Sequence, residues 1–153
     1  MALQKLRHYC AYQERSHQEV KVKAYGYGLK KTDVDVLISK MIEEGYLNEE
    51  RFAKLFAGGR FRVKKWGKQK IAFELRQRRV SDYSIRVALQ EIPGEDYQKV
   101  ADQIAKKKWS SIRGEVVTDY TRQSKTRQYL LQRGFENAVI SAAIRKIMGR
   151  NDD

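Results

Sequence analysis

Apolar residues recur along the chain in a pattern that occurs three times. Each copy has one apolar residue followed by three others at steps of five, four and three positions. The copies consist of Leu29, Val34, Ile38 and Met41, of Val80, Ile85, Leu89 and Ile92, and of Phe135, Ile140, Ile144 and Ile147. Steps of four and three place side chains on one face of an α-helix, and the longer first step suits an apolar anchor in the turn before it. The pattern therefore predicts three equivalent helices, each preceded by a turn.

The positions before each anchor repeat as well. Two further positions correspond in the three copies: Val20 and Ala24, Ile71 and Leu75, and Thr126 and Leu130. The residue directly before the anchor is Gly28 in the first copy, Arg79 in the second and Gly134 in the third. A glycine followed by an apolar residue is typical of the end of a helix. A second helix is therefore expected to end at this position in every copy.

These two helices, with one more helix ahead of them, make each copy a three-helix unit. In the middle copy we expect helices at 49–65, 68–78 and 82–92. The apolar face of the first of these is expected to consist of Phe52, Leu55, Phe56 and Val63. The sequence thus predicts an all-α protein without strands, built of three tandem three-helix repeats at 1–44, 45–93 and 94–153. Because a unit of about 50 residues is marginal alone, the repeats should pack into one continuous, elongated and curved solenoid-like array.

Charge adds a functional expectation to this fold. Of the 153 residues, 32 are Lys or Arg and 19 are Asp or Glu, which gives a formal net charge of +13. Nine of the basic residues lie between Arg60 and Arg79, where Glu74 is the single acidic residue. So many like charges repel one another, and they indicate a surface that meets phosphates or an acidic protein. The candidate binding residues are Arg60, Arg62, Lys64, Lys65, Lys68, Lys70, Arg76, Arg78 and Arg79, joined by Lys107, Lys108 and Arg127.

Other basic and aromatic residues leave two interpretations open. Arg122, Lys125 and Arg133 either form a solvated helix face or extend the same surface. Phe61 and Trp66 lie among the cations, where aromatic rings can stack on unpaired bases. Apolar helix faces use such residues routinely, and we expect both rings to fill the core.

Residue types for common catalytic and metal sites are scarce. The chain has one cysteine, Cys10, and two histidines, His8 and His17, which do not have the spacing of a zinc site or a nucleophile–base motif. Gly26-Tyr27-Gly28 and Gly58-Gly59-Arg60 lack the remaining residues of phosphate-binding loops. We therefore expect Cys10 to lie in the core, and the protein to be no enzyme and to use no cofactor or metal.

Long apolar runs are missing from the sequence. No uncharged stretch approaches the length of a membrane span, and the first ten residues have no apolar signal-peptide core. We accordingly expect a cytoplasmic protein that is a monomer and has no membrane partner.

Segments in each repeat resemble a known family. The Y-L-D-D-x-R-F-A segment of RecX, the bacterial regulator of the RecA recombinase, resembles Tyr46-Leu47-Asn48-Glu49-Glu50-Arg51-Phe52-Ala53. Its K-G-x-x-x-I…E-L stretch resembles Lys65-Trp66-Gly67-Lys68-Gln69-Lys70-Ile71 with Glu74-Leu75, and its R-G-F element resembles Arg133-Gly134-Phe135. The R-S…E-L start of the family resembles Arg15-Ser16 with Glu19-Val20. The chain departs from the pattern at Asn48 in place of the first Asp, at Trp66 before Gly67, and at Arg79, where glycine is common.

The resemblance implies three tandem three-helix repeats and a protein that binds in the groove of the RecA filament on single-stranded DNA. It implies a negative regulator in DNA repair, DNA recombination and the SOS response, which inhibits filament extension, ATPase, strand exchange and coprotease activities. The RecA filament and its single-stranded DNA would be the partners of the basic residues. An alternative stays open: a direct DNA-binding module of tri-helical repeats, in which the same residues contact phosphates of naked DNA.

Overall fold

The computed structural model describes residues 1–114 and 117–152, the side chains of 150–152 excepted, and these residues form helices joined by loops without any strand. Glu115, Val116 and Asp153, which fall in the third predicted repeat, lie outside the described residues. The expected all-α fold of helical repeats is confirmed.

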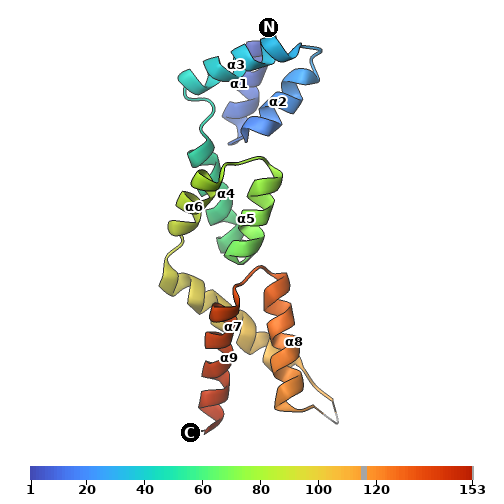
Figure 1. Ribbon diagram of the computed structural model, residues 1–153, viewed down its shortest axis with the longest axis vertical. Helices are drawn as coiled ribbons and strands as arrows, with labels where there is room; N and C mark the ends of the chain where they lie inside the picture. The colour runs from blue at the N-terminus through green and yellow to red at the C-terminus, as the bar shows by residue number, and fades with distance from the viewer. Residues whose placement is uncertain (115–116, 153) are drawn as a thin grey trace. The chain divides into compact units, whose positions relative to one another are not determined.

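The helices follow one another in groups of three and can be traced from blue to red in Figure 1. They are α1 (Ala2–Tyr12), α2 (His17–Tyr25), α3 (Lys31–Glu43), α4 (Glu49–Arg62), α5 (Lys68–Gln77), α6 (Asp82–Gln90), α7 (Gly94–Ser111), α8 (Asp119–Gln132) and α9 (Asn137–Asp152). In the middle group the helices begin where the sequence predicted and end up to three residues earlier.

Contacts between residues divide the chain into two compact units. The first unit consists of 1–57 and 74–91, and the second unit of 58–73 and 92–153. The division falls inside α4 and inside α5, so that each unit contains part of the middle group of helices. The predicted repeat boundaries at 44 and 93 stay a prediction.

The turns before the third helix of each group have the backbone that the sequence predicted. Gly28 and Gly134 have φ angles of +82° and +98°, and Arg79 takes the same left-handed region at +60°. The amides of Val80 and Phe135 close these turns by donating to carbonyls of the preceding helix. Lys65 ends α4 in the same way at a φ of +57°. For a residue with a Cβ this conformation costs about 1 kcal/mol, so Lys65 and Arg79 are strained positions.

The repeated apolar positions form the core of the first unit. The buried cluster consists of Leu6, Cys10, Val20, Ala24, Val34, Ile38, Met41 and Leu47. Burial raises the pKa of the Cys10 thiol to about 11. The charge of Arg15 lowers this pKa, and the charge of Glu14 raises it. The thiol therefore stays protonated at neutral pH and serves as an apolar core group.

Packed aromatic side chains lie in the core of the second unit. Tyr97 lies between Phe61 and Phe135, with ring centroids 5.8 Å and 5.2 Å away. The repeated positions Ile71, Thr126 and Leu130 are fully buried. Here α7 packs against both α8 and α9.

The apolar face of α4 differs from the prediction. Leu55 and Val63 are 55% and 80% exposed, whereas Ala53, Ala57 and Phe61 are buried. The buried residues are spaced by four positions along the helix, as one face requires. The prediction was right for Phe52, which is buried, and wrong for Leu55 and Val63. It favoured large side chains and omitted the small alanines that are buried on this helix.

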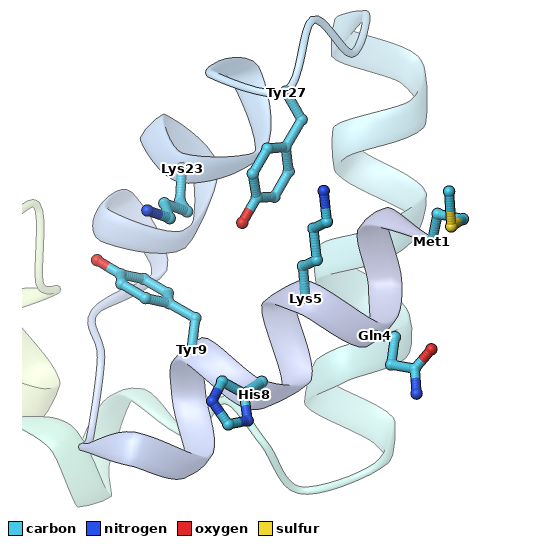
Figure 2. Close-up of a pocket in the computed structure, with 7 residues that line it drawn as sticks. All are labelled: Met1, Gln4, Lys5, His8, Tyr9, Lys23 and Tyr27. Atoms are coloured by element: carbon cyan, nitrogen blue, oxygen red, sulfur yellow. The ribbon is translucent and has the colours of Figure 1, made fainter.

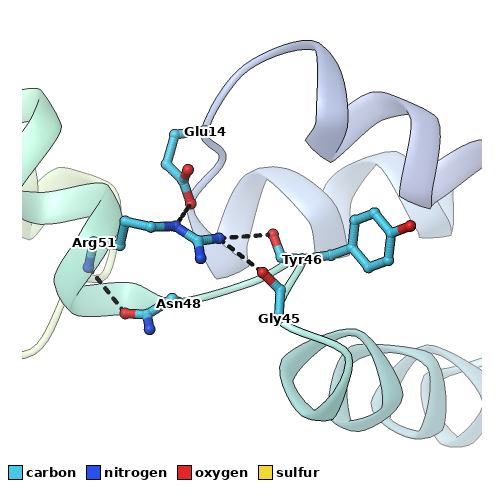
Figure 3. Close-up of polar contacts among 5 residues, drawn as sticks. All are labelled: Glu14, Gly45, Tyr46, Asn48 and Arg51. Carbon is cyan, nitrogen blue, oxygen red and sulfur yellow. Dashed lines mark hydrogen bonds and ion pairs between the residues drawn. The ribbon is translucent and has the colours of Figure 1, made fainter.

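Arg51 joins the start of α4 to two loops of the first unit (Figure 3). Its Nε donates to Glu14 Oε1 at 2.8 Å, and its Nη2 donates to the Gly45 carbonyl at 3.0 Å. Asn48 caps α4 by accepting from the Arg51 amide at 2.9 Å. Within this unit Arg51 and Asn48 therefore fix the position of the first turn of α4.

Candidate functional site

A cation-lined groove runs between α7 and α8 of the second unit. It consists of two pockets of about 450 Å³ and 230 Å³, which share Lys108 and Tyr129 in their walls. We call it the α7–α8 groove. Its cations are Lys65, Lys107, Lys108, Lys125 and Arg133, and its amides are Gln103, Gln128 and Gln132. None of the described residues that line it carries a carboxylate.

Helical spacing explains why these side chains meet. Lys125, Tyr129 and Arg133 follow one another at steps of four along and just after α8, which places them on one face. Gln103 and Lys107 have the same spacing on α7. Lys125 and Arg133, whose role the sequence left open, thus line the groove with Lys107. The step of four was the signal that could have placed them in the candidate set.

Tyr129 is the aromatic centre of the groove. Lys108 Nζ lies 4.9 Å from its ring centroid, and the Arg133 guanidinium lies 5.4 Å from it. Lys65, Lys107 and Lys125 form no ion pair with another described residue. The groove therefore presents positive charge that the described part of the chain does not neutralise.

A second group of cations surrounds the ring of Trp66, and we call it the Trp66 cluster. Lys70 Nζ, Lys64 Nζ and the Arg60 guanidinium lie 4.6, 5.5 and 5.6 Å from its ring. These distances are within the reach of cation–π attraction. The expectation that both aromatic residues fill the core is confirmed for Phe61, which is buried, but Trp66 is only half-buried.

Backbone contacts fix the loop between α4 and α5 to the turn between α8 and α9. The Gly67 amide donates to the Arg133 carbonyl at 2.7 Å, and the Gln69 amide donates to the Gly134 carbonyl at 2.9 Å. A Cβ on Gly67 would lie 2.2 Å from the Gly134 carbonyl carbon. Two glycines therefore permit the approach that sets Lys65 and Arg133 in one pocket.

Tyr97 satisfies the first amide of α5. Its hydroxyl accepts from the Lys68 amide at 2.8 Å and donates to the carboxylate of Glu136. Burial and the bond to Glu136 raise the pKa of Tyr97 well above its usual value. Lys68 Nζ lies 4.8 Å from the same ring, so this candidate cation packs against the core of its unit.

The remaining candidates have other neighbours. The Arg62 guanidinium folds back over Gly58, and Arg127 donates to Ser141 of α9 at 2.9 Å and to Asn137 at 3.3 Å. Three candidates belong to the first unit: Arg76 pairs with Asp82 at 3.5 Å, Arg78 pairs with Glu74 at 3.0 Å, and Arg79 is exposed. A binding role for these residues stays a prediction.

The described residues form neither a cluster of metal ligands nor a membrane-spanning helix. No group of three or more His, Cys, Asp or Glu in this part of the chain is arranged to hold a metal ion. Among the same residues, no helix combines the length and the apolar character needed to cross a membrane.

Comparison with known proteins identifies the family. The model of the second three-helix domain of RecX matches residues 48–89, and that of the third three-helix domain matches residues 95–144. Together they cover more than half of the chain. The chain belongs to the RecX family. A regulatory protein RecX of Vibrio parahaemolyticus is 32% identical over 128 residues, which are 84% of this chain and 77% of that protein.

Other RecX proteins extend the comparison. A regulatory protein RecX of Oceanobacillus iheyensis is 25% identical over 140 residues, and the chain spans about half of its length. The crystal structure of RecX from Lactobacillus salivarius has a TM-score of 0.85 at 20% identity, over 95% of this chain and 93% of that one. A second crystal structure of a regulatory protein RecX has a TM-score of 0.83 at 21% identity, over 92% of this chain and 68% of that one. These structures support the RecX fold.

Proposed function

We propose that the chain is a negative regulator of RecA that binds in the groove of the RecA–single-stranded DNA filament. It inhibits filament extension, ATPase, strand exchange and coprotease activities without catalysis of its own, and it acts in the cytoplasm as a monomer. The α7–α8 groove carries this proposal, since its cations form no ion pair with another described residue and the chain belongs to a family of regulatory proteins. The Trp66 cluster adds three cations on the same unit.

The chemistry of the groove suits a phosphate-rich partner. Lysine and arginine side chains contact phosphate oxygens and release counterions, which favours binding at low salt. Glutamine amides can donate to phosphate oxygens or pair with base edges. Tyr129 provides a face on which an unpaired base can stack. A filament that exposes its DNA strand along a groove offers each of these partners.

The first experiment titrates the DNA-dependent ATPase of RecA with the wild-type chain and with two charge-matched triple variants. The groove variant carries Lys65→Gln, Lys107→Gln and Lys108→Gln. The control variant carries Lys21→Gln, Lys30→Gln and Lys40→Gln, which replace exposed lysines without a described ion pair in the first unit. We expect the groove variant to inhibit at least about tenfold more weakly and the control to behave as wild type. Equal inhibition by the two variants would overturn the assignment of the groove.

A direct DNA-binding module is the second candidate, and the aromatic residues beside the cations favour it. Trp66 and Tyr129 each lie within 6 Å of at least two basic groups, the combination that sequence-tolerant single-strand binders use. This function predicts tight binding to naked single-stranded DNA. In the groove variant, the slope of log binding affinity against log salt concentration should be smaller in magnitude by about 2. Inhibition of RecA only once the DNA is saturated would favour this module, whereas inhibition while the DNA is mostly unbound would favour the filament.

A further inference from the structure

A second pocket lies in the first unit, between α1 and the end of α2 (Figure 2). Its volume is about 550 Å³, which is within the range of roughly 300 to 1,000 Å³ for small-molecule sites. Figure 2 shows Lys5, Tyr9, Lys23 and Tyr27 around the same space. The other lining residues are Met1, Gln4 and His8.

The segment that forms this pocket carries an excess of positive charge, and two of its lysines, Lys5 and Lys23, line the pocket. Residues 1–30 contain six basic and two acidic residues, whereas residues 31–57 contain four basic and six acidic residues. Lys5 and Lys23 form no ion pair with another described residue, and no lining residue is acidic. An anion is therefore the ligand that the pocket favours.

The two tyrosines give the pocket flat walls. The Arg15 guanidinium lies 3.8 Å from the ring centroid of Tyr9, and Arg15 Nε donates to the Tyr9 carbonyl at 3.1 Å, which supports this ring from one side. The backbone of Tyr27 is fixed by its amide, which donates to the Ala24 carbonyl at 3.0 Å. Lys23 Nζ lies 5.2 Å from the ring centroid of Tyr9, and Lys5 Nζ lies 5.4 Å from the ring centroid of Tyr27. Each ring thus has a lysine close to it that can turn to a bound anion.

The repeat pattern relates this pocket to the α7–α8 groove. The offset that aligns Val20 with Thr126 and Ala24 with Leu130 also aligns Lys23 with Tyr129 and Tyr27 with Arg133. Both sites therefore lie between the first and second helices of a three-helix group, and both use one aromatic residue and one cation at the same two positions. The order of the two residue types is reversed between them.

We infer that the pocket between α1 and α2 binds a nucleotide, with its unpaired base against Tyr9 and Tyr27 and its phosphate at Lys5 and Lys23. Stacking on an aromatic ring needs no particular base, because every base has a flat face. The two lysines reach the phosphate as mobile point charges. The ligand is a nucleotide of a single strand or a free nucleotide, which share this chemistry. The comparison with the groove rests on the proposed function, whereas the rings, lysines and volume of the pocket do not.

Photocrosslinking locates such a nucleotide. The 153-residue chain is irradiated with a single-stranded oligonucleotide that contains 5-iodouracil, and the crosslinked residues are identified by mass spectrometry. A second sample contains free 5-iodouridine monophosphate instead. We expect crosslinks at Tyr9 or Tyr27 in at least one sample. Crosslinks with the oligonucleotide alone assign a strand as the ligand, and crosslinks with the monophosphate as well assign a free nucleotide in addition.

Matched tyrosine variants test the role of the rings. Tyr27→Leu keeps an apolar side chain but removes the ring, and we expect it to lower the crosslink yield at Tyr9 about tenfold. Tyr12→Leu is the control, because Tyr12 is an 80% exposed tyrosine of α1 that does not line the pocket. Equal yields in these two variants, or no crosslink at Tyr9 and Tyr27 with either probe, would overturn the inference.

The same experiment separates this inference from the proposed function. A crosslink at Tyr129 without one at Tyr9 or Tyr27 would leave the groove in place and reject the pocket. A crosslink at Tyr27 without one at Tyr129 would support the pocket, and the groove would then have to be judged from the ATPase titration alone.

Discussion

The two units of this chain differ in net charge and in how many ion pairs their described residues form. The first unit has 14 basic and 11 acidic residues, a net charge of +3, and the second has 18 and 8, a net charge of +10. In the first unit ion pairs connect separate helices and loops, as in Arg7–Glu44, Arg51–Glu14 and Lys54–Glu91. In the second, Arg122–Asp119 and Lys146–Asp102 are ion pairs, and neither involves a residue of the α7–α8 groove.

This difference indicates how a small helical protein can keep a charged surface available. A cation held in an ion pair is screened from a partner, and the pair itself adds about 0 to 1 kcal/mol at an exposed site. The second unit instead gains its rigidity from packed rings and from the backbone contact between Gly67 and Gly134. Apart from Lys146, which pairs with Asp102, the described lysines of this unit form no ion pair with another described residue, and those of the α7–α8 groove remain available for a partner.

The largest expected effect comes from that backbone contact. Gly134→Ala would place a Cβ 2.3 Å from Lys70 Cβ in a left-handed backbone, whereas Gly28→Ala has a similar φ and no atom within 4 Å. We expect Gly134→Ala to lower the free energy of unfolding by about 3 kcal/mol and Gly28→Ala by about 1 kcal/mol. Urea unfolding followed by circular dichroism measures both. Equal losses would mean that the close approach does not restrain the second unit.

An intermediate effect is expected at the two strained basic residues. Lys65→Gly and Arg79→Gly should each raise the free energy of unfolding by about 1 kcal/mol, because glycine adopts a positive φ without strain. Lys65 lines the groove, so Lys65→Gly should also weaken binding to RecA filaments on single-stranded DNA, and Arg79→Gly tests whether this exposed candidate of the first unit binds as well. Filament binding by anisotropy, measured beside thermal unfolding, separates the two results. Weaker binding by Arg79→Gly would show that the first unit contributes cations to the interface.

The smallest effect is a pH dependence confined to the first unit. Burial lowers the pKa of His17 below 6.5, although the carboxylate of Glu49 opposes this and Lys21 adds to it. The unfolded chain therefore takes up a proton at a higher pH than the folded chain, and the free energy of unfolding falls as the pH falls through about 6.5. The second unit contains no histidine.

His17→Gln tests this dependence. Urea unfolding of the wild-type chain at about pH 7.5 and about pH 5.5 should show lower stability at the acidic value, and the variant should reduce the difference. A difference of the same size in the variant would mean that other groups, such as carboxylates, cause the loss of stability.

The fold could be read from the sequence to the extent that apolar spacing determines it. The step of five, four and three positions located the buried Val34, Ile38 and Met41, and glycine before an apolar residue located the turns at Gly28 and Gly134. The face of α4 was predicted only at Phe52, because Ala53 and Ala57 carry little hydrophobic signal although they are buried on this helix. The approach of Gly67 to Gly134 has no local signal at all, since it joins residues far apart in the sequence.

The candidate site was predictable in its charge but not in its grouping. A run of cations between 60 and 79 indicates a basic surface, and it does not tell which side chains share a face. The structure places Lys65 beside Lys107 and Lys108, while Arg76 and Arg78 pair with carboxylates of the first unit. These groupings depend on contacts between distant helices, which sequence spacing cannot supply.

The division of α4 and α5 between the two units has a consequence for exchanging parts among relatives. The segment that matches the second three-helix domain of RecX, residues 48–89, is continuous in sequence but contributes residues to both compact units. A chimera that takes this segment from a relative must therefore suit the apolar surfaces on both sides of the division at once. The repeat describes the sequence pattern, whereas the two compact units determine which neighbouring residues an exchanged segment must fit.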